Sequence, residues 1–471
     1  MEKLARIVVL GGGIEGLSLL EYLRWHGFEN VTLLDENEAW DGDKNLAARV
    51  ILGPEVFKSL AEYDVVFKSP GIRLSKLGMV KGVLRSTTEF FFERKKGLVI
   101  GVTGTKGKGT TSTLIYNMLL EGGLDVYLGG NIGYSPLSFV DQLTEKSVTV
   151  LEMSSFQLQD MKMSPNVSVM LNVTEDHLDF HADVEEYRAA KRAIFEFQNE
   201  GDLAILNADY PVLKEFYGDL GKGKKVWVSM KGAEANGHPT EWEVSGSSLV
   251  GGMGAWIEWK NEVEGVIYVQ IDGTKEEIVQ VSDVALLGKY MLENVLPAIF
   301  VARHLGMANE IIAKVLREFK GLPHRLELVR ELKGRKFYND SFSTGPVTSV
   351  AACSAFREPI ALIAGGSDKG LQYDEWAAAL WENPAVRVVV LIGQIAPQLE
   401  ESLKKAAAVS PEHPAMRIFH ASAFEEAIRL AYDGIPDGGV VLLSPASASF
   451  GMFKNYKERG ERFRAIVGRM V

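Results

Sequence analysis

The residues from Gly101 to Thr111 have the types and the order that phosphate chemistry requires. They read Gly-Val-Thr-Gly-Thr-Lys-Gly-Lys-Gly-Thr-Thr and continue an apolar run that begins at Leu98. Glycines let backbone N–H groups approach anionic oxygens, Lys108 supplies a positive charge, and threonine hydroxyls are available to Mg²⁺. Gly109 stands where the common nucleotide loop has Ser or Thr, so we expect Thr110 to face the metal. Helical apolar spacing follows, which favours a phosphate site at a helix N-terminus over the alternative, a plain surface turn.

Two further segments carry acids near the ends of predicted strands. Ser147–Met153 reads as a buried strand that contains Glu152, and a carboxylate on a strand beside a phosphate loop is a usual partner of Mg²⁺. The strand Val167–Leu171 leads into a dense polar run that contains Glu175, Asp176, His177, Asp179 and His181. This run predicts a second metal position, and a solvated acidic turn is the alternative.

Lys191 stands on the apolar face of a predicted helix. The spacing predicts a helix over Val184–Gln198, in which Tyr187, Ile194 and Phe195 lie one turn from Lys191. Burial lowers the pKa of a lysine and makes the neutral amine available, which can react with CO₂ to give an anionic carbamate. Such a carbamate is an oxygen ligand for Mg²⁺; a lysine that extends its ammonium to solvent is the alternative.

The chain begins with a strand that runs into a glycine-rich turn. Ile7–Leu10 leads into the G-x-G-x-x-G pattern of Gly11–Gly16, and a second strand ends in Asp35, placed to meet a ribose hydroxyl. The strand Asp64–Phe67 runs into a similar turn, Ser69-Pro-Gly-Ile72. The pattern indicates a dinucleotide-type fold. A redox cofactor and a merely close-packed turn both remain open.

The last third of the chain alternates strands with helices. Its predicted strands are Arg335–Asn339, Ile360–Ala364, Val388–Ile392, Met416–Phe419 and Gly439–Leu443. Polar loops follow three strand ends: Asn339–Thr344, Gly365–Gly370 and Ser444–Ser449. Because carboxyl ends of parallel strands share one sheet edge, we expect these loops to converge as a substrate-binding rim.

Together these segments predict an α/β protein of three domains, over residues 1–96, 97–321 and 322–471. The first is Rossmann-like, the second is a phosphate-loop ATPase-type parallel sheet, and the third is again Rossmann-like. The region Lys224–Val281 alternates polar and apolar residues with many glycines, which predicts peripheral antiparallel hairpins. Lys289–Leu305 and Asn309–Phe319 read as helices.

Composition limits the classes of function. The 471 residues are 46% hydrophobic and 24% charged, as in an ordinary globular protein. A net charge of −11 argues against general nucleic-acid binding. The lone Cys353 rules out an internal disulfide and a cysteine-based zinc site. With no signal peptide and no apolar stretch of membrane length, we expect a cytoplasmic protein that binds no membrane.

The ordered motifs of the chain resemble the Mur ligases over essentially its full length. The matching segments are Thr103–Lys108, Gly130–Gly133, Leu151–Leu158, Asn172–Asp179, Tyr187–Lys191, His324–Arg325, Asn339–Ser341 and Leu443–Ser449. Within this family, Ser154–Gln157, the serine-rich loop Ser444–Ser449 and Phe453–Gly460 favour the glutamate-adding members.

The resemblance implies an ATP-dependent ligase that adds D-glutamate to UDP-N-acetylmuramoyl-L-alanine through an acyl phosphate, in peptidoglycan precursor synthesis. It implies two Mg²⁺ ions, small-molecule partners only and, with no evident interface, a monomer. A nicotinamide oxidoreductase would not explain the phosphate loop, and a phosphate-loop GTPase or ATPase switch would not explain the third domain. Another Mur ligase or a folylpolyglutamate-type ligase is the remaining alternative.

The same resemblance assigns roles residue by residue. The predicted catalytic residues are Lys108, Glu152, His177 and Lys191, and the metal ligands are Thr110, Glu152, His177 and carbamylated Lys191. The predicted ATP contacts are Gly104, Thr105, Lys106, Gly107, Lys108, Gly109, Thr110, Asn294, Arg325 and Asp340. The predicted UDP-sugar contacts are Ile14, Glu15, Asp35, Glu36, Ser69, Gly71 and Asn131. The predicted glutamate contacts are Thr344, Lys369, Ser449 and Tyr456.

Three positions depart from the family pattern. Phe342 stands where a lysine often contacts phosphate, so that charge must come from elsewhere or be dispensable. Met291 replaces an asparagine frequently found near the adenine, and Tyr456 replaces a common phenylalanine.

Overall fold

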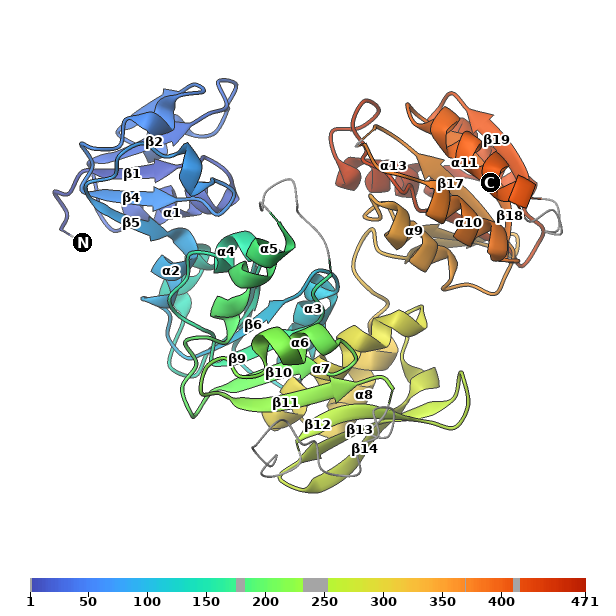
Figure 1. Ribbon diagram of the computed structural model, residues 1–471, viewed down its shortest axis with the longest axis horizontal. Helices are drawn as coiled ribbons and strands as arrows, with labels where there is room; N and C mark the ends of the chain where they lie inside the picture. The colour runs from blue at the N-terminus through green and yellow to red at the C-terminus, as the bar shows by residue number, and fades with distance from the viewer. Residues whose placement is uncertain (1, 175–182, 232–252, 369, 410–415) are drawn as a thin grey trace. The chain divides into compact units, whose positions relative to one another are not determined.

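The computed structural model describes residues 2–174, 183–231, 253–368, 370–409 and 416–471. Its strands form three sheets, each accompanied by helices, which confirms the predicted α/β class (Figure 1). The chain divides into two compact units, one of residues 1–284 with 292–317 and the other of residues 285–291 with 318–471. The three domain boundaries predicted above stay a prediction. No helix within the described ranges is long and apolar enough to cross a membrane.

The first sheet is five-stranded and parallel, in the order β3-β2-β1-β4-β5. Its strands are β1 (Ile7–Leu10), β2 (Val31–Asp35), β3 (Arg49–Leu52), β4 (Val65–Lys68) and β5 (Val83–Ser86). Helices α1 (Ile14–Trp25) and α2 (Thr87–Phe92) follow β1 and β5. The strand order reverses between β1 and β4, the place where open α/β sheets bind ligands.

The second sheet has nine strands in the order β14-β13-β12-β11-β10-β9-β6-β8-β7. The strands that surround the phosphate loop are β6 (Leu98–Thr103), β7 (Val126–Gly130), β8 (Val148–Glu152), β9 (Val167–Met170) and β10 (Leu203–Asn207). The helices are α3 (Lys108–Glu121), α4 (Ser155–Leu158), α5 (Val184–Ala190), α6 (Pro211–Tyr217), α7 (Leu292–His304) and α8 (Asn309–Glu318).

The strands predicted as peripheral hairpins belong to this same sheet. They are β11 (Lys224–Ser229), β12 (Gly254–Trp259), β13 (Gly265–Ile271) and β14 (Thr274–Gln280). β11 pairs in parallel with β10, and β12 in parallel with β11, whereas β13 and β14 continue the sheet antiparallel. The prediction of antiparallel hairpins was therefore wrong for β11 and is confirmed for β12 to β14, because β12 pairs antiparallel with β13 and β13 with β14. The buried side chains of β11 and β12, such as Val226 and Ile257, fit an extension of the central sheet.

The third sheet has the order β15-β16-β20-β17-β18-β19. Its strands are β15 (Glu327–Leu332), β16 (Arg335–Asn339), β17 (Ile360–Gly365), β18 (Val386–Ile392), β19 (Arg417–Ala421) and β20 (Val440–Leu443). Its helices are α9 (Pro346–Cys353), α10 (Asp374–Glu382), α11 (Ala396–Val409), α12 (Phe424–Gly434) and α13 (Tyr456–Arg469). Among the described strands of this sheet, β15, which sequence analysis missed, is the one added antiparallel, beside β16. The adjacent strands β16, β20 and β17 direct three polar loops to one edge.

Candidate functional site

The predicted phosphate loop connects β6 to α3, as its sequence requires. Gly107 caps the helix with a φ of 88°, in the left-handed region that glycine tolerates. A Cβ atom at this position would lie 1.8 Å from Oδ1 of Asn294 at the start of α7. Thr111 Oγ1 also donates a hydrogen bond to the Asn294 carbonyl, at 3.1 Å. The loop is therefore packed closely against the start of α7, and glycine is obligatory at its centre.

Asn172, directly after β9, holds the loop in place. Its Oδ1 accepts hydrogen bonds from the backbone N–H groups of Thr105, at 3.1 Å, and Lys106, at 2.9 Å. The Lys108 ammonium donates to the carbonyls of Gly104, at 2.9 Å, and Thr105, at 3.1 Å. The lysine charge thus lies inside the loop. Sequence analysis missed the role of Asn172, although its place at a strand end beside β6 was a signal.

Glu152 ends β8, next to the phosphate-loop strand, where it pairs with Val102. Its side chain is only 7% exposed, and its Oε1 accepts a hydrogen bond of 3.0 Å from Asn131 Nδ2. The Asn131 backbone N–H donates to the Glu152 carbonyl at 2.9 Å. Asn131, predicted to contact the UDP-sugar, therefore orients the predicted metal ligand.

Lys191 is 1% exposed, which confirms that its side chain is buried. Its Nζ lies 3.5 Å from the Gly104 carbonyl oxygen and 4.6 Å from the centre of the Tyr187 ring. Tyr187 OH is in turn 3.0 Å from Thr105 Oγ1. The buried lysine and its tyrosine neighbour therefore lie against the phosphate loop.

The helix predicted over Val184–Gln198 is shorter than expected. α5 ends at Ala190, and a 3₁₀ turn follows over Arg192–Ile194. The hydroxyls of Ser164 and Ser168 donate 2.7 Å hydrogen bonds to the carbonyls of Ala193 and Ile194. These carbonyls are thereby taken from a continuing helix.

The acidic run predicted as a second metal position, with His177, lies outside the described residues. Among the residues that are described, no three His, Cys, Asp or Glu side chains converge as a metal site. The candidate oxygen ligands of this unit are the Glu152 carboxylate and the Thr110 hydroxyl, which is buried in the first turn of α3.

Glu15 links the first sheet to the central one. Its carboxylate accepts hydrogen bonds from Gln157 Nε2, at 2.6 Å, and from Thr87 Oγ1. Burial raises the pKa of Glu15, and these two hydrogen bonds oppose the shift. Nearby, the buried Lys68 pairs with Asp160 across the same junction, at 2.8 Å. Two polar contacts therefore tie the N-terminal turns to the segment that follows Glu152.

The Asp35 carboxylate, at the end of β2, binds the glycine-rich turn that follows β1. It accepts hydrogen bonds from the backbone N–H groups of Gly12, at 2.6 Å, and Asn37, at 2.8 Å. Ser69 Oγ donates to the Gly11 carbonyl at 3.3 Å. The structure brings Asp35 and Ser69 to this one turn. Of the other predicted UDP-sugar contacts, Ile14 and Gly71 are exposed, and Glu36 pairs with Lys76 at 2.6 Å.

The three polar loops of the third sheet converge, as predicted. Ser444 Oγ donates to Asp340 Oδ2 at 2.7 Å, and the Ser367 N–H donates to the Ala448 carbonyl at 3.0 Å. Burial raises the pKa of Asp340 to about 6, against the effect of hydrogen bonds from Ser343 and Ser444. Ser449 is buried beside this junction. Lys369 lies outside the described residues.

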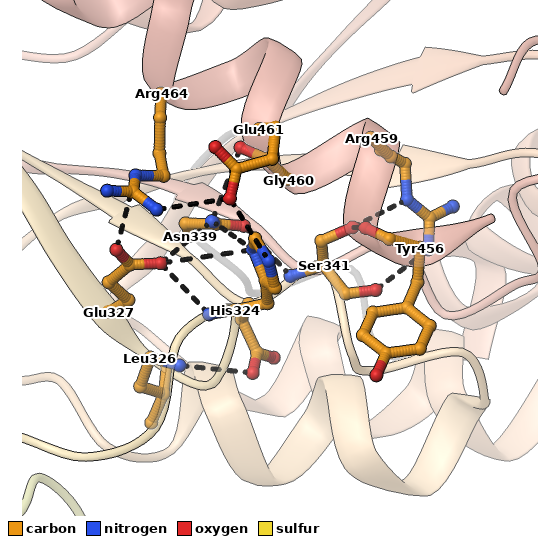
Figure 2. Close-up of polar contacts among 11 residues, drawn as sticks. His324, Leu326, Glu327, Asn339, Ser341, Tyr456, Arg459, Gly460, Glu461 and Arg464 are labelled. Atoms are coloured by element: carbon orange, nitrogen blue, oxygen red, sulfur yellow. Dashed lines mark hydrogen bonds and ion pairs between the residues drawn. The ribbon is translucent and has the colours of Figure 1, made fainter. Parts of the chain in front are cut away.

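Arg459 on α13 braces two of these loops from within. It is buried and donates hydrogen bonds to the carbonyls of Ser341, at 2.9 Å, and Ser447, at 3.2 Å. Figure 2 shows its contact with Ser341. Burial lowers the pKa of its guanidinium to about 9. Sequence analysis missed Arg459; the signal was an arginine one turn before the apolar Phe463 on the same helix face.

Figure 2 shows a second polar cluster, around His324, in the same unit. The Nδ1 atom of His324 lies 2.9 Å from Asn339 Nδ2, and the His324 backbone N–H donates a hydrogen bond of 2.9 Å to the Glu327 carboxylate. Burial lowers the pKa of His324, and the charges of Glu327 and Glu461 oppose this. The cluster secures the backbone on either side of Arg325. Of the predicted glutamate contacts, Thr344 donates its N–H to the Phe342 carbonyl.

Comparison with known proteins identifies the family. Residues 102–302 match the Mur ligase middle domain, and residues 324–447 match the Mur ligase, glutamate ligase domain. The UDP-N-acetylmuramoylalanine–D-glutamate ligase of Acetivibrio thermocellus is 37% identical over 99% of this chain and 96% of its own length. The enzyme of the same name from Thermoanaerobacter sp. is 35% identical over 99% of this chain and 98% of its own.

Solved structures share the fold. The MurF ligase from Thermotoga maritima in complex with ADP matches with a TM-score of 0.58 at 19% identity, covering 98% of this chain and 95% of that one. The UDP-N-acetylmuramate–alanine ligase of the same organism gives 0.59 at 18%, covering 98% and 99%. With both domain matches and full-length relatives above 30% identity, this chain belongs to the Mur ligase family.

Proposed function

We propose that this protein is an ATP-dependent ligase that joins D-glutamate to UDP-N-acetylmuramoyl-L-alanine in peptidoglycan precursor synthesis. The observation that carries the proposal is the 37% identity, over nearly the whole of both chains, to a D-glutamate ligase. The enzyme acts in the cytoplasm as a monomer, on small molecules alone.

In the proposed reaction, the alanyl carboxylate attacks the γ-phosphate of ATP, which gives an acyl phosphate and ADP. The glutamate amine then attacks the acyl carbon, phosphate leaves, and an amide remains after the amine loses a proton. Two anionic reactants must be neutralised and held in line. The loop Gly104–Thr110 and the ammonium of Lys108 supply positive charge and backbone donors for this task. Asn294, Arg325 and Asp340 are further proposed ATP contacts.

The residues near the loop suit Mg²⁺. Glu152 is buried, Asn131 orients its carboxyl group, and Mg²⁺ prefers oxygen ligands. Glu152 and Thr110 would hold one ion, and His177 with carbamylated Lys191 a second. When bound, the ions neutralise charge on the phosphates. Burial of Lys191 against the loop supports carbamylation, because desolvation favours the neutral amine that reacts with CO₂.

The remaining assignments concern the two other substrates. The UDP-sugar would contact Ile14, Glu15, Asp35, Glu36, Ser69, Gly71 and Asn131. Glutamate would contact Thr344, Lys369, Ser449 and Tyr456. Hydroxyl groups and a cation suit its two carboxylates.

Phosphate release from ATP, with Mg²⁺ and UDP-N-acetylmuramoyl-L-alanine, tests the proposal. D-Glutamate should be required, and L-glutamate or other amino acids should give only background release. Lys108→Ala should abolish release, whereas Lys96→Ala, an exposed lysine before β6, should not. Release with another amino acid would overturn the substrate assignment. Release without any UDP-sugar would overturn the ligase.

A further inference from the structure

Phe342, the residue that replaces the family's lysine, lies against an arginine. The guanidinium carbon of Arg325 is 3.9 Å from the centre of the Phe342 ring. Phe342 in turn meets the Tyr456 ring edge-on, with centres 4.9 Å apart and planes at 84°. Phe342 thus lies between Arg325 and Tyr456, and it is 38% exposed.

The backbone that carries Arg325 is held in an unusual conformation. Its two neighbours, His324 and Leu326, have φ values of 65° and 44°, in the left-handed region that costs energy for side chains with a Cβ. The Phe342 N–H donates to the His324 carbonyl at 3.0 Å, and the Leu326 N–H donates to Asp340 at 3.3 Å. The loop after β16 therefore fixes the backbone beside Arg325 while its phenylalanine ring supports the side chain.

A phenyl ring at position 342 supports the Arg325 guanidinium better than a positively charged side chain would. The face of a phenyl ring is electron-rich and attracts a guanidinium that lies over it. A lysine at position 342 would bring an ammonium beside the guanidinium, and the like charges would repel each other.

We propose that Phe342 is a positioning residue that holds Arg325 for the phosphates of ATP. The lysine's charge is absent in this chain, and the phenylalanine ring at its position instead supports the arginine that the chain shares with the family. This inference rests on the proposed function only in assigning Arg325 to the nucleotide.

Calorimetric titration of the full chain with a non-hydrolysable ATP analogue and Mg²⁺ tests the proposal. Phe342→Leu should weaken binding about three- to tenfold, the range expected for loss of a partly exposed cation–π contact. Phe342→Tyr keeps the ring and should bind within about twofold of the parent. Phe342→Lys should weaken binding at least as much as Phe342→Leu. Phe197→Leu, at a phenylalanine of similar exposure outside the site (42%), is the matched control and should change nothing.

A double-mutant cycle isolates the pair. In an Arg325→Met background, Phe342→Leu should have no further effect on affinity for the analogue. In the phosphate-release assay, Phe342→Leu should raise the KM for ATP but not that for the UDP-sugar. Equal losses in both backgrounds, or tighter binding by Phe342→Lys, would overturn the proposal. If the parent released no phosphate with UDP-sugar, the ligase proposal would fail, and the analogue titrations alone would decide the role of Phe342.

Discussion

Gln157 Nε2 donates a hydrogen bond of 2.6 Å to Glu15 Oε1, across 142 positions of the chain. Gln157 also closes the capping box of α4 with Ser154. The residues directly after Glu152 are thus bound to the glycine-rich turn proposed for the UDP-sugar. Through this hydrogen bond we expect occupation of that turn to affect the position of the candidate metal ligand.

Replacing Gln157 by Ala should destabilise the protein and weaken UDP-sugar use. Loss of the amide leaves the partly buried Glu15 carboxyl short of a partner, which costs about 1–3 kcal/mol of unfolding free energy. Urea denaturation and the KM for the UDP-sugar measure the two effects. Gln159→Ala, at an exposed glutamine beside the same helix, should stay within about 0.5 kcal/mol. Equal effects of the two changes would contradict the linkage.

Asp340 should make stability depend on pH. Its pKa is about 6 in the folded chain against 3.8 for an ordinary aspartate, so the folded state holds its proton more tightly. This contribution is complete below about pH 4 and is lost as the pH rises through 6. Between pH 5 and 7 the parent should lose about 1 kcal/mol of unfolding free energy relative to Asp340→Asn. Parallel pH profiles of the two proteins in chemical denaturation would refute the assignment.

Arg459 should be essential to the third sheet's loops. Replacing it by Met leaves the carbonyls of Ser341 and Ser447 buried without their donor, which should cost about 3 kcal/mol. The midpoint of urea unfolding checks this. Arg462→Met, an exposed arginine on the same helix, serves as control and should have little effect. If Arg459→Met lowered the unfolding free energy only slightly, the loops would hold together without this arginine.

Carbamylation of Lys191 should be directly visible. After equilibration with ¹³C-bicarbonate, the parent should give a carbamate carbon resonance that Lys191→Arg lacks. Lys225→Arg, at a half-buried lysine whose pKa is lowered by burial, should keep the resonance. Removal of CO₂ should reduce ligase activity in the parent. Full activity in CO₂-free buffer, with no resonance, would exclude the modification.

Much of this arrangement follows from local sequence. Short segments with clear periodicity predicted three features. These are the strand, loop and helix around Lys108, the strand end at Glu152 and the burial of Lys191. The convergence of the three C-terminal loops followed from one rule about parallel strands.

The missed features depend on partners far along the chain. The carbonyls of Ala193 and Ile194, beyond the end of α5, bond to the hydroxyls of Ser164 and Ser168, which no local pattern reveals. Gln157 reaches Glu15 only once two sheets have packed. The departure at Phe342 was visible in the sequence, but its meaning needed the position of Arg325.

Isotope transfer tests the proposed chemistry most directly. UDP-N-acetylmuramoyl-L-alanine labelled with ¹⁸O in its alanyl carboxylate is incubated with ATP, Mg²⁺ and D-glutamate, and the phosphate and product are analysed by mass spectrometry. An acyl phosphate predicts one ¹⁸O atom in each phosphate released, together with the D-glutamyl amide. Phosphate without label, or label transfer with no amide formed, would contradict ligation through carboxylate activation.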